Sequence, residues 1–162
     1  MIYIGSDHAG YDLKEVVKVA LDEAEREYVD LGVFTTDSAD YPDVAREVAE
    51  KVSENAVVHV GGAPDTSAMG ILICGTGTGM VMAANKLDGI RAASVTNETL
   101  AEMARRHNDA NIITLGSRIV DKELAVKLVN IFLSTPFDGD ERHQKRIAKI
   151  TEIEQSRDKK KN

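Results

Sequence analysis

Short apolar runs alternate with helix-like segments along almost the whole chain, and this alternation restricts the possible folds most. Each run is followed by a turn of glycine or polar residues, and then by apolar residues at helical spacing. The runs lie at residues 2–4, 28–33, 70–74, 90–95 and 111–115. The pattern predicts an α/β fold, a Rossmann-like three-layer α/β/α sandwich around a five-stranded parallel sheet.

The length and composition indicate one folded domain. The chain has 162 residues, of which 43% are hydrophobic, which suffices for a single sizeable core. We expect residues 1–155 to form this domain and the polar, basic residues 156–162 to form a frayed tail. Residues 57–69 are too many for a simple helix-to-strand connection and predict an inserted hairpin or flap.

The bulk properties exclude several classes of protein. A formal net charge of -7 argues against general binding to nucleic acid. No apolar run approaches the ~20 residues of a membrane helix, and the chain opens on a strand pattern without the features of a signal peptide. A single cysteine cannot form an internal disulfide. We therefore expect a protein of the reducing cytoplasm.

A glycine-rich turn follows the most apolar run, with the sequence Cys74-Gly75-Thr76-Gly77-Thr78-Gly79-Met80. It lacks the Gly-Lys-Ser/Thr of a phosphate-binding P-loop, and Met80 stands where a dinucleotide fingerprint has its third glycine. Three alternating glycines favour an anion or oxyanion cradle over a plain tight turn. The helix start beyond them favours a thiolate at Cys74, as a base or a nucleophile. A buried structural cysteine is the alternative.

The carboxyl ends of parallel strands meet at one edge of a sheet, where ligands bind. Four predicted exit turns carry polar residues, and we expect them to line one crevice. They are Asp7 with His8, residues 74–79, Thr96 with Asn97, and Ser117 with Arg118. Asp7 and His8 have the alternative role of capping the next helix.

Other candidate residues belong at the opposite edge of the sheet. The helix from about Asn97 to His107 runs back over the sheet for roughly 15 Å. His107 is therefore expected far from Cys74 of its own chain, and a catalytic His107 would serve a neighbouring subunit; a helix C-cap is the alternative. Arg142 and Arg146 are four residues apart and share a helical face, which suits either a phosphate clamp or a solvated surface.

Eight segments, taken together and in order, resemble the ribose-5-phosphate isomerase type B family, which is grouped with galactose-6-phosphate and allose-6-phosphate isomerases. They are residues 5–10, 40–42, 70–77, 83–86, 89–92, 106–111, 115–118 and 142–144. The resemblance implies an aldose–ketose isomerase that forms an enediolate from a sugar phosphate without a metal or another cofactor. It also implies a homodimer, or a pair of dimers, whose sites are built across the interface.

The resemblance assigns roles to individual residues. It implies that Cys74 is the base, His107 opens the sugar ring, Asp7 relays protons, and Thr76 with the backbone of residues 75–79 holds the oxyanion. The implied substrate contacts are His8, Tyr41, Gly75, Gly77, Thr78, Gly79, Asn108 and Arg118, with Arg142 and Arg146 as the phosphate clamp.

Two departures from the family pattern stand out, namely the long 57–69 segment and Val81, where many members have a small polar residue. The sequence leaves open a hexose-6-phosphate isomerase on the same scaffold, for allose or galactose 6-phosphate. A non-catalytic sugar-phosphate sensor is the alternative from another functional class.

Overall fold

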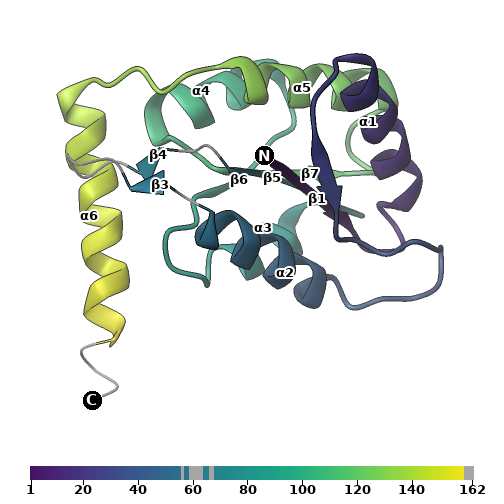
Figure 1. Cartoon of the computed structure of the whole chain (residues 1–162), viewed down its shortest axis with the longest axis horizontal. Helices are drawn as coiled ribbons and strands as arrows, with labels where there is room; N and C mark the ends of the chain where they lie inside the picture. The colour runs from purple at the N-terminus through teal and green to yellow at the C-terminus, as the bar shows by residue number, and fades with distance from the viewer. Residues whose placement is uncertain (56, 59–63, 66–67, 159–162) are drawn as a thin grey trace.

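Five parallel strands form one sheet in the order β2-β1-β5-β7-β6. In Figure 1 the sheet lies between α1, α4 and α5 on one side and α2 and α3 on the other. The computed structural model describes residues 1–55, 57–58, 64–65 and 68–158. The strands are β1 (Ile2–Ser6), β2 (Tyr28–Asp30), β5 (Met69–Cys74), β6 (Ala92–Ser94) and β7 (Ile112–Gly116). The sheet confirms the predicted fold class, and β5 lies at its centre because its side chains are apolar on both faces.

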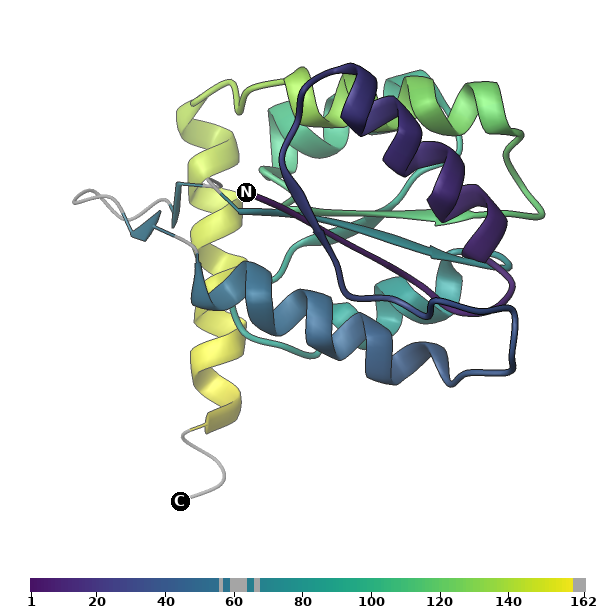
Figure 2. The ribbon, with the colours of Figure 1, turned by 45° about the vertical axis from the view of Figure 1, so that its right-hand side comes forward.

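Helices cover both faces of this sheet (Figure 2). On one face lie α1 (Tyr11–Glu23), α4 (Glu98–Asn108) and α5 (Lys122–Ser134), and on the other lie α2 (Tyr41–Glu54) and α3 (Thr78–Ala84). Alternate residues of the strands enter the two cores. Ile71 and Ile73 pack with the first group of helices, whereas Leu72 and Cys74 pack with the second.

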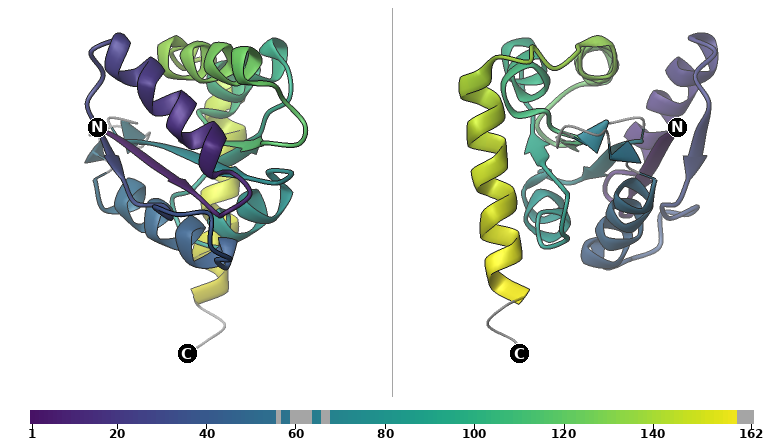
Figure 3. Two further views of the ribbon diagram at one scale, coloured as in Figure 1. Left: turned by 90° about the vertical axis from the view of Figure 1, so that its right-hand side faces the viewer. Right: turned by 60° about the vertical axis from the view of Figure 1, so that its left-hand side comes forward.

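The last helix, α6 (Glu141–Asp158), stands apart from the two layers. It runs past the end of the sheet at which the parallel strands begin, and then continues beyond the layer of α2 and α3 (Figure 3). Ile150 and Ile153 remain exposed on it. Because α6 reaches Asp158, residues 156–158 of the predicted frayed tail are helical; residues 159–162 lie outside the described part of the chain.

The long segment before β5 contains a short hairpin. Strands β3 (Val57–Val58) and β4 (Pro64–Asp65) pair antiparallel, as expected for an inserted hairpin. Residues 56, 59–63 and 66–67 of the predicted insertion and its surroundings lie outside the described residues. Within the described ranges, no helix has the length and apolar character needed to span a membrane.

Candidate active site

A cavity of about 220 Å³ opens at the carboxyl ends of β1, β5 and β7. Strand β1 lies between β2 and β5, so the chain leaves β1 toward one side of the sheet and later continues on the other side. Ligands of α/β sheets bind at such a switch point in the strand order. The lining residues are Asp7, His8, Ala9, Tyr41, Cys74, Gly75, Thr76, Gly79 and Arg118. Three of the four predicted exit turns therefore meet in one crevice.

The fourth exit turn does not reach the crevice, and that part of the prediction was wrong. Thr96 and Asn97 follow β6, which lies at the edge of the sheet beyond β7. One more strand therefore separates them from the switch point. Asn97 instead caps α4, where its side-chain oxygen accepts the Leu100 N–H at 2.9 Å.

Cys74 ends β5 with its side chain buried at the floor of the crevice. The backbone N–H of Gly77 donates to Cys74 Sγ at 3.1 Å. Gly77 has φ +80°, a left-handed conformation that glycine adopts without steric cost, and it is the N-cap residue from which the chain enters α3. This donor stabilises negative charge on the sulfur, so the Gly77 N–H serves the thiol before it serves any ligand oxygen.

Two other glycines of the turn allow side chains to approach it closely. A Cβ on Gly79 would lie 2.6 Å from Tyr41 Cζ, and one on Gly75 would lie 3.4 Å from the Arg118 guanidinium carbon. The Arg118 N–H also donates to the Gly75 carbonyl at 3.1 Å. The close approach to these glycines places Tyr41 and Arg118 in the lining of the cavity that also contains Cys74, whereas Thr78 is exposed and does not line that cavity.

Asp7 and His8 occupy the neighbouring rim. Asp7 is buried, and its Oδ1 accepts the Gly10 N–H at 3.0 Å, which closes the turn before α1. His8 is exposed, and its Nδ1 accepts the Ala39 N–H at 3.3 Å. Both residues therefore combine a local structural bond with a place in the crevice.

A buried lysine holds the loop that carries Ala39 and leads to Tyr41. Lys14 Nζ is fully buried and donates to both carboxylate oxygens of Asp30, at 2.7 and 2.8 Å, and to the Val33 carbonyl at 2.9 Å. Burial alone would raise the pKa of Asp30, but hydrogen bonds from Lys14, Lys18 and the Gly32 N–H lower this pKa below its ordinary value. Sequence reasoning missed this pair, although its signal was a lysine beside Leu13 on the apolar face of α1.

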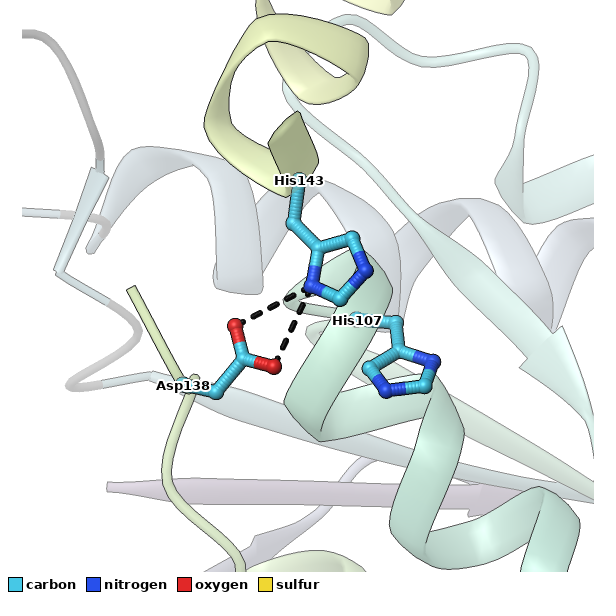
Figure 4. A group of neighbouring side chains, drawn as sticks. All are labelled: His107, Asp138 and His143. Atoms are coloured by element: carbon cyan, nitrogen blue, oxygen red, sulfur yellow. Dashed lines mark hydrogen bonds and ion pairs between the residues drawn. The ribbon is translucent and has the colours of Figure 1, made fainter. Parts of the chain in front are cut away.

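The remaining predicted residues lie at the opposite edge of the sheet, as expected from the direction of α4. His107 and Asn108 end α4, while Arg142 and Arg146 are exposed on the first turns of α6. The structure does not bring them to Cys74 of the same chain. Instead, the His107 ring packs against the ring of His143 with 4.3 Å between centroids, and His143 Nδ1 lies 3.1 Å from the Asp138 carboxylate (Figure 4).

A buried ion cluster fixes the end of α4 beside these residues. The Asp109 carboxylate lies 2.8 Å from Arg91 Nη2 and 2.8 Å from Arg105 Nη1. Burial lowers the pKa of Arg91, and the Asp109 charge opposes that effect. Asp109 adopts φ 45° as the C-cap, so the cluster sets the direction of the chain immediately after His107 and Asn108.

Comparison with known proteins decides the family. Residues 2–150 match the ribose/galactose isomerase family. The chain belongs to this family. It is 42% identical over 156 residues to ribose-5-phosphate isomerase B of Escherichia coli (strain K12), covering 96% of this chain and 97% of that protein.

Solved structures of other ribose/galactose isomerase relatives share the fold. Clostridium thermocellum ribose-5-phosphate isomerase B is 44% identical with a TM-score of 0.86, and covers 96% of this chain and 97% of its own. The Mycoplasma genitalium ribose-5-phosphate isomerase B structure with bound ribulose-5-phosphate is 42% identical with a TM-score of 0.84, covering 95% of each chain. The resemblance predicted from the motifs is confirmed, and the chain is an isomerase.

Proposed function

We propose that this isomerase interconverts ribose 5-phosphate and ribulose 5-phosphate through an enediolate, without a metal or another cofactor. The observation that carries the proposal is the buried Cys74 thiol in the crevice, with the Gly77 N–H aimed at its sulfur. The names of the relatives support this substrate, since one solved relative holds ribulose 5-phosphate. A cavity of about 220 Å³ also suits a small substrate.

The proposed chemistry is a proton transfer between adjacent carbons. The Cys74 thiolate takes the proton from C2 of the open-chain aldose, and the electrons of that C–H bond form the C1–C2 double bond while O1 becomes negative. The thiol then returns its proton to C1, and the O2 oxygen becomes the ketone carbonyl. Asp7 carries the O2 proton to O1. The step needs a basic group within reach of C2, and the Cys74 sulfur, which accepts the Gly77 N–H, borders the cavity where C2 would lie.

The negative oxygen of the enediolate needs fixed donors. Thr76 is placed to supply one, because its Oγ1 accepts the Thr78 N–H at 3.4 Å and can direct its own hydrogen toward the cavity. The backbone of Gly75 and Gly79 borders the same space. Gly77 acts through the sulfur instead, so the turn divides its donors between the base and the oxyanion.

We infer that a second copy of the chain completes each site. His107 would open the sugar ring, Asn108 would contact the sugar, and Arg142 with Arg146 would hold the phosphate, while His8, Tyr41 and Arg118 of the first chain contact the substrate. These groups lie at opposite edges of one chain's sheet, so they act together only in a homodimer or a pair of dimers. The exposed Ile150 and Ile153 on the projecting α6, and the exposed Met82 on α3, support such an interface. The lone cysteine is consistent with a cytoplasmic enzyme.

The substrate is tested by initial rates on ribose 5-phosphate, allose 6-phosphate and galactose 6-phosphate, with and without a chelator. We expect preference for ribose 5-phosphate and no loss of rate with the chelator. Cys74→Ala should lose nearly all turnover and keep substrate binding by calorimetry. Retained turnover in this variant would remove Cys74 from the role of base, and preference for a hexose phosphate would reassign the substrate.

The shared site is tested by mixing inactive Cys74→Ala and His107→Asn chains after subunit exchange. Half of the resulting dimers are mixed, and each mixed dimer has one intact site, so we expect about a quarter of the wild-type rate. The unmixed variants, taken through the same exchange, are the controls. Mixed dimers without activity would show that Cys74 and His107 do not combine across an interface into one working site.

A further inference from the structure

Two imidazoles and a carboxylate gather at the edge of the sheet opposite the Cys74 crevice (Figure 4). His107 comes from the end of α4, Asp138 from the loop before α6, and His143 from the first turn of α6. One potential ligand atom from each residue lies within 4.8 Å of the other two. These atoms come from separate segments and converge on one small volume.

We propose that His107, Asp138 and His143 bind a divalent transition-metal ion such as Zn²⁺, and that the bound ion inhibits the isomerase. The binding half stands on the cluster alone, whereas the inhibition half rests on the role proposed for His107. Imidazole nitrogen with carboxylate oxygen is a donor set that Zn²⁺ and Co²⁺ accept. Mg²⁺ and Ca²⁺ prefer oxygen ligands and are not expected here.

The ligand spacing needs a limited adjustment. With bonds of about 2.0–2.2 Å, tetrahedral ligand atoms lie about 3.3 Å apart. His143 Nδ1 is already 3.1 Å from both oxygens of Asp138. The widest separation in the cluster is at most 4.8 Å, and His107 is only half-buried at the end of its helix. A small rotation of the His107 side chain is therefore sufficient to close the site.

The backbone holds two of the three ligands in place. Asp138 Oδ1 accepts the Asp140 N–H at 3.1 Å, and the Asp138 N–H donates to the Arg106 carbonyl at 3.2 Å. His143 is 3% exposed, and its own N–H donates to the Asp140 carbonyl at 2.9 Å. Metal binding has to order its ligand side chains, which costs conformational entropy. Asp138 and His143 are already held by the folded chain, so this entropic cost is small for them.

Coordination would take a ring nitrogen of His107 that ring opening requires. Metal binding and ring opening would then compete for the imidazole of His107. The proposed enzyme therefore needs no metal for its reaction, but a bound metal ion would inhibit it. A chelator is expected to leave the rate unchanged or to raise it. If the three residues formed only an ion pair and a ring contact at the start of α6, they would show no affinity beyond that of isolated histidines.

Binding is tested with Co²⁺ and Zn²⁺ on the full chain carrying Cys74→Ala, which removes the thiol as a competing ligand. We expect one equivalent per chain, followed by the visible absorption of Co²⁺ and by competition of Zn²⁺ with a chromogenic chelator. Asp138→Asn and His107→Asn, each added to this background, should weaken binding at least about tenfold. His8→Asn, a histidine outside the cluster, is the matched control and should leave the affinity unchanged. Equal affinity in all these proteins would overturn the site.

Inhibition is tested by the rate of the enzyme with native Cys74 in the presence of Zn²⁺, and again after a chelator is added. Asp138→Asn should keep its metal-free rate and need at least about tenfold more Zn²⁺ for half-inhibition. The same half-inhibition in both proteins would show that the metal acts elsewhere, through Cys74 for example. An inactive protein would refute the proposed function, while the binding experiment on Cys74→Ala would still decide the metal site.

Discussion

Replacing Asp109 with asparagine removes one buried negative charge and turns one of its two acceptor oxygens into an NH2 donor. The Asp109 side chain is 6% exposed, and its two oxygens each lie 2.8 Å from a guanidinium, of Arg91 and of Arg105. Its backbone adopts φ 45°, which asparagine tolerates as well as aspartate does. A change in stability in Asp109→Asn therefore reports the ion cluster and not the strain of the turn.

The magnitude follows from the partners that remain. Removal of one member of a buried ion pair costs about 3–5 kcal/mol. Arg91 Nε keeps the carbonyl oxygens of residues 108 and 109, at 3.1 and 2.9 Å, and Arg105 keeps the Ala110 carbonyl at 2.7 Å. Each guanidinium keeps at least one backbone carbonyl acceptor, although one of them then faces the asparagine NH2, so we expect the lower end, about 3 kcal/mol. In a chain of this size that corresponds to a fall in Tm of about 6–12 °C.

The assay is urea unfolding at neutral pH and at one fixed protein concentration, since assembly would shift the apparent stability. The slope of free energy against urea should stay the same while the midpoint falls. Asp43→Asn is the matched control. Asp43 and its partner Arg46 form an ion pair of 3.5 Å in which both side chains are exposed, so this substitution should change the free energy of unfolding by less than about 0.5 kcal/mol. A loss below about 1 kcal/mol in Asp109→Asn would refute the reasoning about the buried cluster.

Three further predictions concern the crevice, the phosphate and the acid response. Gly79→Ala places a Cβ 2.6 Å from Tyr41 Cζ, so the ring must move, and KM should rise several-fold in steady-state kinetics while the urea midpoint stays nearly unchanged. Arg142→Ala should raise KM for ribose 5-phosphate at least about tenfold, with a smaller change in kcat, because one charged hydrogen bond is lost; an unchanged KM would locate the phosphate elsewhere. In the folded protein the pKa of Asp30 lies below the ordinary aspartate pKa of about 4. The Asp30 carboxylate therefore stabilises the folded protein when the pH is above the ordinary pKa, and this stabilisation disappears as the pH falls through the lowered pKa. Asp30→Asn should therefore lose less stability than the parent in urea titrations between neutral pH and about pH 3, and parallel losses would contradict this.

The central part of the sheet was predictable because burial on both faces leaves a continuous apolar run, as in residues 70–74. Edge strands were harder to delimit. The run 28–33 was predicted as one strand, but the regular pairing of β2 ends at Asp30. The Leu31 and Val33 N–H groups still donate to the Ile4 and Ser6 carbonyls, so the backbone continues beside β1 after the strand pattern ends. The apolar pattern therefore predicted correctly that residues 28–33 lie beside β1, but it overestimated the length of the regular strand.

The crevice was predictable because parallel strands end at the same edge, but the order of the strands was not. Only the order shows that the exit turn of β6, with Thr96 and Asn97, lies one strand too far away. The ion pairs were hidden for a similar reason. Lys14 meets Asp30 across a helix-to-strand connection, whereas Arg91 directly precedes β6 and meets Asp109 only after the chain has passed through β6 and α4. Neither pairing follows a helical or strand period that a sequence could display.

The geometry of a parallel α/β sheet explains why the candidate residues form two separate groups. A five-residue strand is about 17 Å long, and the eleven residues of α4 return over about the same distance. Any side chain at the end of α4 is therefore displaced by a full strand length from the carboxyl ends where Cys74 lies. On the proposed function, two chains create two whole sites from four half-sites, and each His107 faces the crevice of the partner. The metal cluster contains that same His107, so a bound sugar phosphate should reduce metal affinity in the dimer, and metal should reduce substrate affinity by an equal factor.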